Sequence, residues 1–147
     1  MKKIMITGLL TFTLLTGCSA VTDVSNGLKY VPEATDYIND VQQFANDIPA
    51  LAETAITDQT ARIELEKLLK EMKSDIQDFK ELTPPSMFED VHNQVIEHNN
   101  AFQEGIDNYL TAIKDGALNK DLLEQSGLLD DVAVYTDLLN QIKKLGE

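Results

Sequence analysis

The chain has 147 residues, with 12 Lys and Arg against 25 Asp and Glu and a formal net charge of -13, a size typical of one domain. This balance disfavours nucleic acid as a partner, because phosphate backbones are bound by clustered Lys and Arg side chains, and the sequence has no basic patch. Hydrophobic residues make up 43% of the chain, which excludes the composition of a disordered protein and predicts one packed core.

The N-terminus has the organisation of a secretion signal. Lys2 and Lys3 form a short positive segment, and an apolar run follows from Ile4 to Leu15, which is the arrangement of a signal peptide. The run is too short for a permanent membrane span, which needs roughly 20 apolar residues. We therefore expect residues 1–17 to be cleaved from the mature protein.

The apolar run ends in Leu15, Thr16, Gly17 and Cys18, which is the order of residues in a lipobox. With this motif the chain resembles a bacterial lipoprotein precursor. The resemblance implies cleavage between Gly17 and Cys18 and attachment of a diacylglyceryl group to the Cys18 thiol, and it leaves open whether the new amino terminus is acylated. The alternative is that Cys18 is an incidental residue after an ordinary signal peptide.

Lipidation of Cys18 would determine both the location and the chemistry of the mature protein. Two or more acyl chains hold a protein stably at a membrane, so the expected location is the extracytoplasmic face of the cell membrane. Cys18 is the only cysteine, and the domain would therefore have no disulfide, thiol nucleophile or Cys-based metal site. Residues 18–30 are expected to form the lipidated N-terminus and a short tether. Removal of residues 1–17 takes away two lysines and no acid, which makes the chain still more acidic.

Amphipathic helices are expected over the remaining residues, 31–147. From Ala34 to Ala55 apolar residues recur at spacings of three and four, the period of a helix with one buried face. Pro49 lies inside this stretch, and a proline in a helix interior removes a hydrogen bond. The sequence thus predicts a bend at Pro49, or a new helical segment capped by Asp47.

A proline pair separates the second helix from the third. The second is expected to run from the N-cap Asp58 to about Leu82, and Thr83-Pro84-Pro85 ends it, because proline disfavours helical geometry in the residue before it. Ser86 and Glu89 have the spacing of a capping box that starts the third helix. Asp115-Gly116 predicts its end, with the glycine after the C-cap.

The last part of the chain, residues 119–145, continues the helical period, and we expect Gly127 to divide a short helix from the long last one. No alternating run of β-branched residues predicts a strand. The predicted fold class is all-α, an antiparallel bundle of about four helices. Each long helix is expected to have about 24 to 29 residues, so that the rods match in length.

Glu89 and His92 form a Glu-x-x-His pattern, which in di-iron bundles places two metal ligands one turn apart. The pattern is incomplete, because the other histidine, His98, has Val95 three residues before it, and Glu89 already has a role in the capping box. We therefore predict no metal site. Glu89, His92 and His98 are only weak candidates for metal ligands. We interpret His92 mainly as a hydrogen-bonding residue on the flank of the helix.

His98 and Asn99 lie near the apolar stripe of the third helix. A buried polar residue in a bundle can fix the register of its helices, and the alternative is a polar pocket that faces a ligand. The acidic pairs Asp36/Asp40, Asp75/Asp78 and Asp130/Asp131 could attract cations, but they lack the ligand spacing of an EF-hand. Acidic residues on separate helices are usually a solvated face.

The sequence offers no catalytic machinery that we can assign. Its cysteine is used by the lipobox, and neither a Gly-x-Ser-x-Gly motif nor a phosphate-binding loop is present, which are the patterns that mark common nucleophile and nucleotide sites. We expect no enzymatic activity and no cofactor.

Four segments together carry a family resemblance: the lipobox, Tyr30 to Asn39, Leu82 to Pro85, and Asp137 to Ile142. With them the chain resembles an uncharacterised family of small lipoproteins from Gram-positive bacilli, which has a domain of unknown function. The resemblance covers nearly the whole chain. It implies that the protein is located in the cell envelope, and it assigns no active site.

These patterns favour a membrane-anchored extracytoplasmic lipoprotein that acts as a non-enzymatic interaction or structural module, with an envelope protein as its partner. The alternative is a lipoprotein that binds a metal ion or a small cationic ligand, suggested by His92, His98 and the acidic surface. The oligomeric state has no signature in the sequence.

Overall fold

The computed structural model describes residues 18–130 and 132–147, with side chains from Lys29 onward. No strand occurs in these residues, and the all-α prediction is confirmed. The elements in chain order are α1 (Cys18–Ala55), α2 (Gln59–Glu81), the 3-10 turn η1 (Ser86–Phe88), α3 (Glu89–Lys114), α4 (Leu122–Gln125) and α5 (Val132–Leu145).

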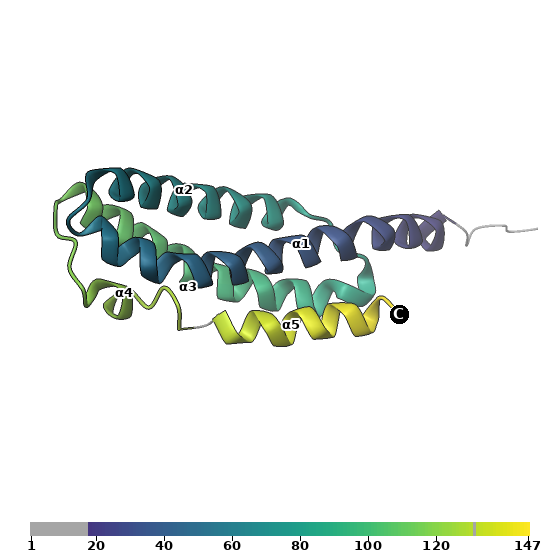
Figure 1. Ribbon diagram of the computed structural model, residues 1–147. Helices are drawn as coiled ribbons and strands as arrows, with labels where there is room; N and C mark the ends of the chain where they lie inside the picture. The colour runs from purple at the N-terminus through teal and green to yellow at the C-terminus, as the bar shows by residue number, and fades with distance from the viewer. Residues whose placement is uncertain (1–17, 131) are drawn as a thin grey trace, which may run out of the picture.

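Four of these helices form an antiparallel bundle. Helix α1 packs against α2 and α5, and α3 packs against the same two helices, so the four surround a common core. Figure 1 shows them side by side, with α4 beside one end of the bundle and the first turns of α1 extending beyond the other end. The predicted bundle of about four helices is therefore confirmed, with α4 as a short addition.

The core consists of the apolar stripes that the helical period places on one face of each helix. Buried side chains begin at Tyr30 on α1 and continue to Ile142 on α5. Burial of a Leu, Ile or Phe side chain contributes about 1.5–3 kcal/mol relative to leaving it exposed. Since no disulfide is available in the described residues, these contacts carry most of the stability.

Helix α1 differs from the expectation at Pro49. It runs without interruption from Cys18 to Ala55 and contains both Pro32 and Pro49, so the predicted new segment capped by Asp47 is wrong. Both prolines are exposed. A proline on the solvent side leaves the carbonyl that lost its donor close to water, which reduces the cost of the missing hydrogen bond.

The helices also differ in length more than the sequence pattern predicts. Residues 18–30, expected to form the lipidated N-terminus and a short tether, are helical and belong to α1, which has 38 residues and spans about 57 Å at 1.5 Å per residue. Helix α5 has only 14 residues. Within the described part of the chain, no helix combines the length and apolar character that a membrane span requires.

Local sequence signals explain most helix ends. The Asp58 side chain accepts a hydrogen bond of 2.8 Å from the Ala61 amide, which confirms this N-cap. The Arg62 guanidinium donates to the carbonyls of Ala55 and Ile56, which are acceptors left open at the end of α1. Gly116 and Gly127 have φ of +68° and +67°, a backbone conformation that glycine adopts without strain.

The start of α3 is a correction to the sequence analysis. Neither Pro85 before η1 nor Phe88 before α3 makes a side-chain capping hydrogen bond, and the predicted capping box of Ser86 and Glu89 does not form. Instead Ser86–Phe88 form a 3-10 turn, in which the Glu89 amide donates to the Ser86 carbonyl. The backbone itself thus satisfies a donor that the Ser86 side chain was expected to bind.

Candidate functional site

Two stripes of carboxylates meet along the contact between α1 and α2. On α1 they are spaced by three, four and seven residues, and on α2 by four and three, so each stripe lies on one face of its helix. Because the two helices pack as antiparallel neighbours, the stripes lie across from one another. We call this surface the acidic groove and define it by Glu33, Asp36, Asp40, Asp47, Glu71, Asp75 and Asp78.

The acidic groove is a chain of three shallow hollows. The first, of about 340 Å³, shares Asp40 and Asp75 with the second, of about 180 Å³. The second shares Asp47 with a third of about 620 Å³ near the turn between α1 and α2. Their lining combines carboxylates with apolar side chains, and among the described residues it includes no Lys, Arg or His. The groove is therefore an elongated acidic surface with an apolar floor.

The charges in the acidic groove are poorly compensated. The ion pairs between described residues are Lys67 with Glu71, Lys70 with Glu66, and Lys73 with Asp107, and of these only Glu71 belongs to the groove. Burial raises the pKa of Asp75 above its ordinary value of 3.8, and the carboxylates of Asp40, Asp78 and Glu71 raise it further. The protonated form of Asp75 is thus more favoured than it would be in water.

This repulsion predicts that the substitution Asp75→Asn stabilises the protein at neutral pH by about 0.5 kcal/mol, the size of a few like-charge contacts on helices. Asp75 has a raised pKa in the folded protein, so its stability contribution is greatest below its unfolded pKa and is lost as pH rises through the folded pKa. Urea unfolding of both proteins at pH 7 and pH 3 measures the difference, which should disappear at pH 3.

The matched control is Glu104→Gln, which removes one exposed carboxylate from α3 outside the acidic groove. It has the same effect on net charge, so a gain of equal size from both substitutions would mean that only the total charge matters. That result would contradict the local repulsion at Asp75.

A polar cluster in the core lies directly behind the groove. The hydroxyl groups of Tyr37 and Tyr135 donate to Oδ1 of Asn99 over 2.5 and 2.7 Å, and Asn99 is fully buried. This one oxygen therefore joins α1, α3 and α5. Burial, with Tyr135 close by, raises the pKa of Tyr37 well above its usual range. The prediction that a buried polar residue fixes helix register agrees with this position of Asn99.

His92 is a core residue, where the sequence indicated the flank of the helix. Its exposed fraction is 4%, its ring stacks on Phe79 with the centroids 4.8 Å apart, and its Nδ1 lies 3.2 Å from the Tyr30 hydroxyl. Burial lowers its pKa, so the ring is neutral near pH 7. His92 is buried because Tyr30 of α1 and Phe79 of α2 pack against it. These neighbours are far away in the sequence, so the local pattern of α3 does not predict them.

The structure does not bring the weak metal candidates together. Glu89 is exposed at the start of α3, His92 contacts Tyr30 and Phe79, and His98 lies half-buried against the ring of Tyr135. Within residues 18–130 and 132–147 no three His, Cys, Asp or Glu side chains are grouped closely enough to hold a metal ion. The carboxylates of the acidic groove would therefore attract a cation without surrounding it as a set of metal ligands.

Several predicted residues lie outside what the structure describes. Leu15, Thr16 and Gly17 of the lipobox and Asp131 of one acidic pair are among them. Cys18 is the first residue of α1, at the end of the helix that extends beyond the bundle (Figure 1). The lipidation of Cys18 remains a prediction from sequence.

The sequence did not predict that these carboxylates form one continuous groove. Asp36/Asp40 and Asp75/Asp78 were each weighed as separate pairs on solvated faces. The signal that could have joined them is the helical spacing of the acids from Glu33 to Asp47 and from Glu71 to Asp78. That spacing shows that each set shares a face, but only the packing of α1 on α2 shows that the two faces adjoin.

Comparisons with known proteins agree with this description and assign no activity. The chain is 37% identical to the uncharacterized lipoprotein YybP of Bacillus subtilis (strain 168), over 99% of both chains. No solved structure matches it. Residues 30–145 match the model of a family of unknown function, DUF6376, and this match begins at Tyr30, where the described buried core begins. The resemblance to an uncharacterised lipoprotein family is thus confirmed, and the chain belongs to the family of unknown function DUF6376.

Proposed function

We propose that this protein is a lipid-anchored, extracytoplasmic and non-enzymatic module that uses its acidic groove to bind a basic segment of a cell-envelope protein. The groove is the observation that carries the proposal. The anchor is argued from the lipobox and from similarity to a lipoprotein.

The shape and charge of the acidic groove favour an extended partner. Its carboxylates follow the two helices over several turns, and its floor contains the apolar side chains Phe44, Met72 and Phe79. An amphipathic segment with Lys or Arg beside apolar residues complements both features, and such charge complementarity accelerates association and selects partners. Binding should therefore weaken as salt is added.

A module of this kind needs no reactive group. The acidic groove supplies carboxylates and apolar contacts, with neither histidine nor cysteine among its described lining residues. The buried Tyr37, Asn99 and Tyr135 are bonded to one another, which supports a structural role for the polar core.

The second candidate function is binding of a metal ion or a small cation in the acidic groove. The carboxylates of Asp40, Asp75 and Asp78 around one hollow support it, because neighbouring negative charges attract a cation. The spacing of the carboxylates makes it the weaker candidate, since no metal-sized group of ligands occurs in the described chain.

Site-specific photo-crosslinking in intact cells tests the proposal. A photoreactive residue at Gln43, which is exposed in the acidic groove, should capture a partner, whereas one at Gln141 on the exposed face of α5 should not. The triple substitution Asp36→Asn, Asp40→Asn and Asp78→Asn should abolish the adduct. Mass spectrometry should place the crosslink in a segment rich in Lys or Arg.

The matched control is Glu97→Gln, Glu104→Gln and Glu124→Gln, which removes three exposed carboxylates outside the groove. Loss of the adduct in both triple variants would reduce the effect to net charge and contradict a groove-specific partner. Absence of any adduct, combined with calorimetric binding of Ca²⁺ that the groove variant abolishes, would establish the second candidate instead.

A further inference from the structure

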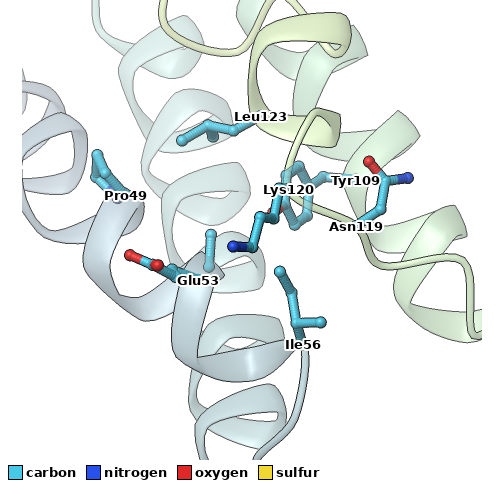
Figure 2. Close-up of a pocket in the computed structure, with 8 residues that line it drawn as sticks. Pro49, Glu53, Ile56, Tyr109, Asn119, Lys120 and Leu123 are labelled. Carbon is cyan, nitrogen blue, oxygen red and sulfur yellow. The ribbon is translucent and has the colours of Figure 1, made fainter.

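A separate cavity lies at the end of the bundle that α5 does not reach. It has a volume of about 220 Å³ and is enclosed by the C-terminal part of α1, by Tyr109 of α3 and by the connection from α3 to α4. Figure 2 shows side chains from these three segments around one space. None of its lining residues belongs to the acidic groove.

The cavity follows from the shortness of α5. Helix α5 has 14 residues and α3 has 26, so the fourth helix extends along only part of the bundle. Over the remaining length, the connection after Gly116 and the single turn of α4 cover α1 and α3. A short irregular connection fills this space less completely than a helix would.

Tyr109 borders the cavity, and its hydroxyl has no hydrogen-bond partner among residues 18–130 and 132–147. Its exposed fraction is 1%, and burial raises its pKa. Among the described side chains, the one polar atom that is both enclosed and unpaired is Nδ2 of Asn99, so the Tyr109 hydroxyl retains an opening. Figure 2 shows the Tyr109 ring beside Lys120, facing the space that α1 closes on the other side. A hydroxyl that opens into a cavity and has no partner among the described residues is available to a ligand.

Two opposite charges border the same cavity. Lys120 comes from the connection after α3, and Figure 2 shows its ammonium group directed toward the side of α1 that carries Glu53. These two groups form no ion pair, although both belong to the described part of the chain. The apolar side chains of Ile56 and Leu123 line the same cavity. The lining of the cavity thus combines a cation, an anion and apolar side chains.

We propose that this cavity binds a small zwitterion, a free amino acid with an apolar side chain. The ligand's ammonium group would bind the Glu53 carboxylate, its carboxylate would bind the Lys120 ammonium group, and its apolar part would contact Ile56 and Leu123. The Tyr109 hydroxyl supplies a hydrogen bond inside the cavity. This site is independent of the acidic groove and of the lipid anchor.

Calorimetry on the purified mature protein, with L-leucine as the probe, tests the site. Isoamylamine and 4-methylpentanoate share the apolar body of leucine but each lacks one charge, and both should bind roughly tenfold more weakly, the effect of one lost charged hydrogen bond. Glu53→Gln and Lys120→Gln should each weaken leucine binding by roughly the same factor. Tyr109→Phe should weaken it about threefold, the effect of a neutral hydrogen bond.

The controls are Glu104→Gln and Lys114→Gln, which change exposed charges of α3 away from the cavity and should leave leucine affinity unchanged. Absence of heat, and of any shift in the methyl resonances of Ile56 and Leu123, at millimolar leucine would overturn the proposal. If either singly charged probe bound as tightly as leucine, the zwitterion would be overturned as the ligand class.

Discussion

Replacement of Asn99 by alanine is expected to lower the free energy of unfolding by about 3 kcal/mol, the combined cost of a core cavity and of two lost hydrogen bonds between helices. Asn99 is fully buried, and its Oδ1 accepts from Tyr37 and Tyr135. These bonds join three helices, so their loss affects the packing of α1, α3 and α5 together. Urea unfolding followed by circular dichroism measures the change.

Asn93→Ala is the matched control for Asn99→Ala. Asn93 lies on the same helix, is exposed and makes no hydrogen bond to a described residue, so its loss should change the free energy of unfolding by less than about 0.5 kcal/mol. Equal effects of the two substitutions would mean that the polar cluster contributes nothing beyond helix propensity. Such equality would contradict its role in fixing the register.

The second large effect is expected for Gly105→Val, which should cost about 2–3 kcal/mol, as overpacking of a tightly packed core does. A Cβ at Gly105 would lie 3.1 Å from Cα of Leu128 and 3.2 Å from the Ser126 carbonyl oxygen. Both are backbone atoms and cannot rotate away. The connection that contains Gly127 would have to move off α3, which should expose the buried Leu128.

Ala101→Val supplies the comparison for Gly105→Val. Ala101 occupies an exposed position one turn earlier on α3, so valine there should cost only its lower helix propensity, about 0.5 kcal/mol. Thermal unfolding of the two variants gives the difference. If Gly105→Val were no more harmful than Ala101→Val, the close approach of the connection to α3 would be excluded.

The sequence predicted those parts of the fold that depend on local interactions. Asp58 caps α2 because its carboxylate reaches an amide three residues ahead, and Gly116 and Gly127 allow left-handed backbone at the two breaks. Each signal acts within one turn of helix. Together with the apolar period, they were sufficient for the helix number and the bundle class.

The features that the sequence did not predict depend on partners far along the chain. Tyr30 and Phe79 determine that His92 is buried, and they come from two other helices. The continuous helix through Pro49 was likewise not predicted, because local proline propensity does not show that this residue faces solvent. The acidic groove likewise needs the packing of α1 on α2, which no window within one helix contains.

The most direct test of the central claim, a lipid anchor on Cys18, is metabolic labelling with a palmitate analogue combined with membrane fractionation. The wild-type protein should incorporate the label and remain with membranes. Cys18→Ala should abolish labelling and release the protein, because a stable anchor requires the acyl chains. Unchanged membrane retention of an unlabelled Cys18→Ala protein would contradict the lipid-anchored function.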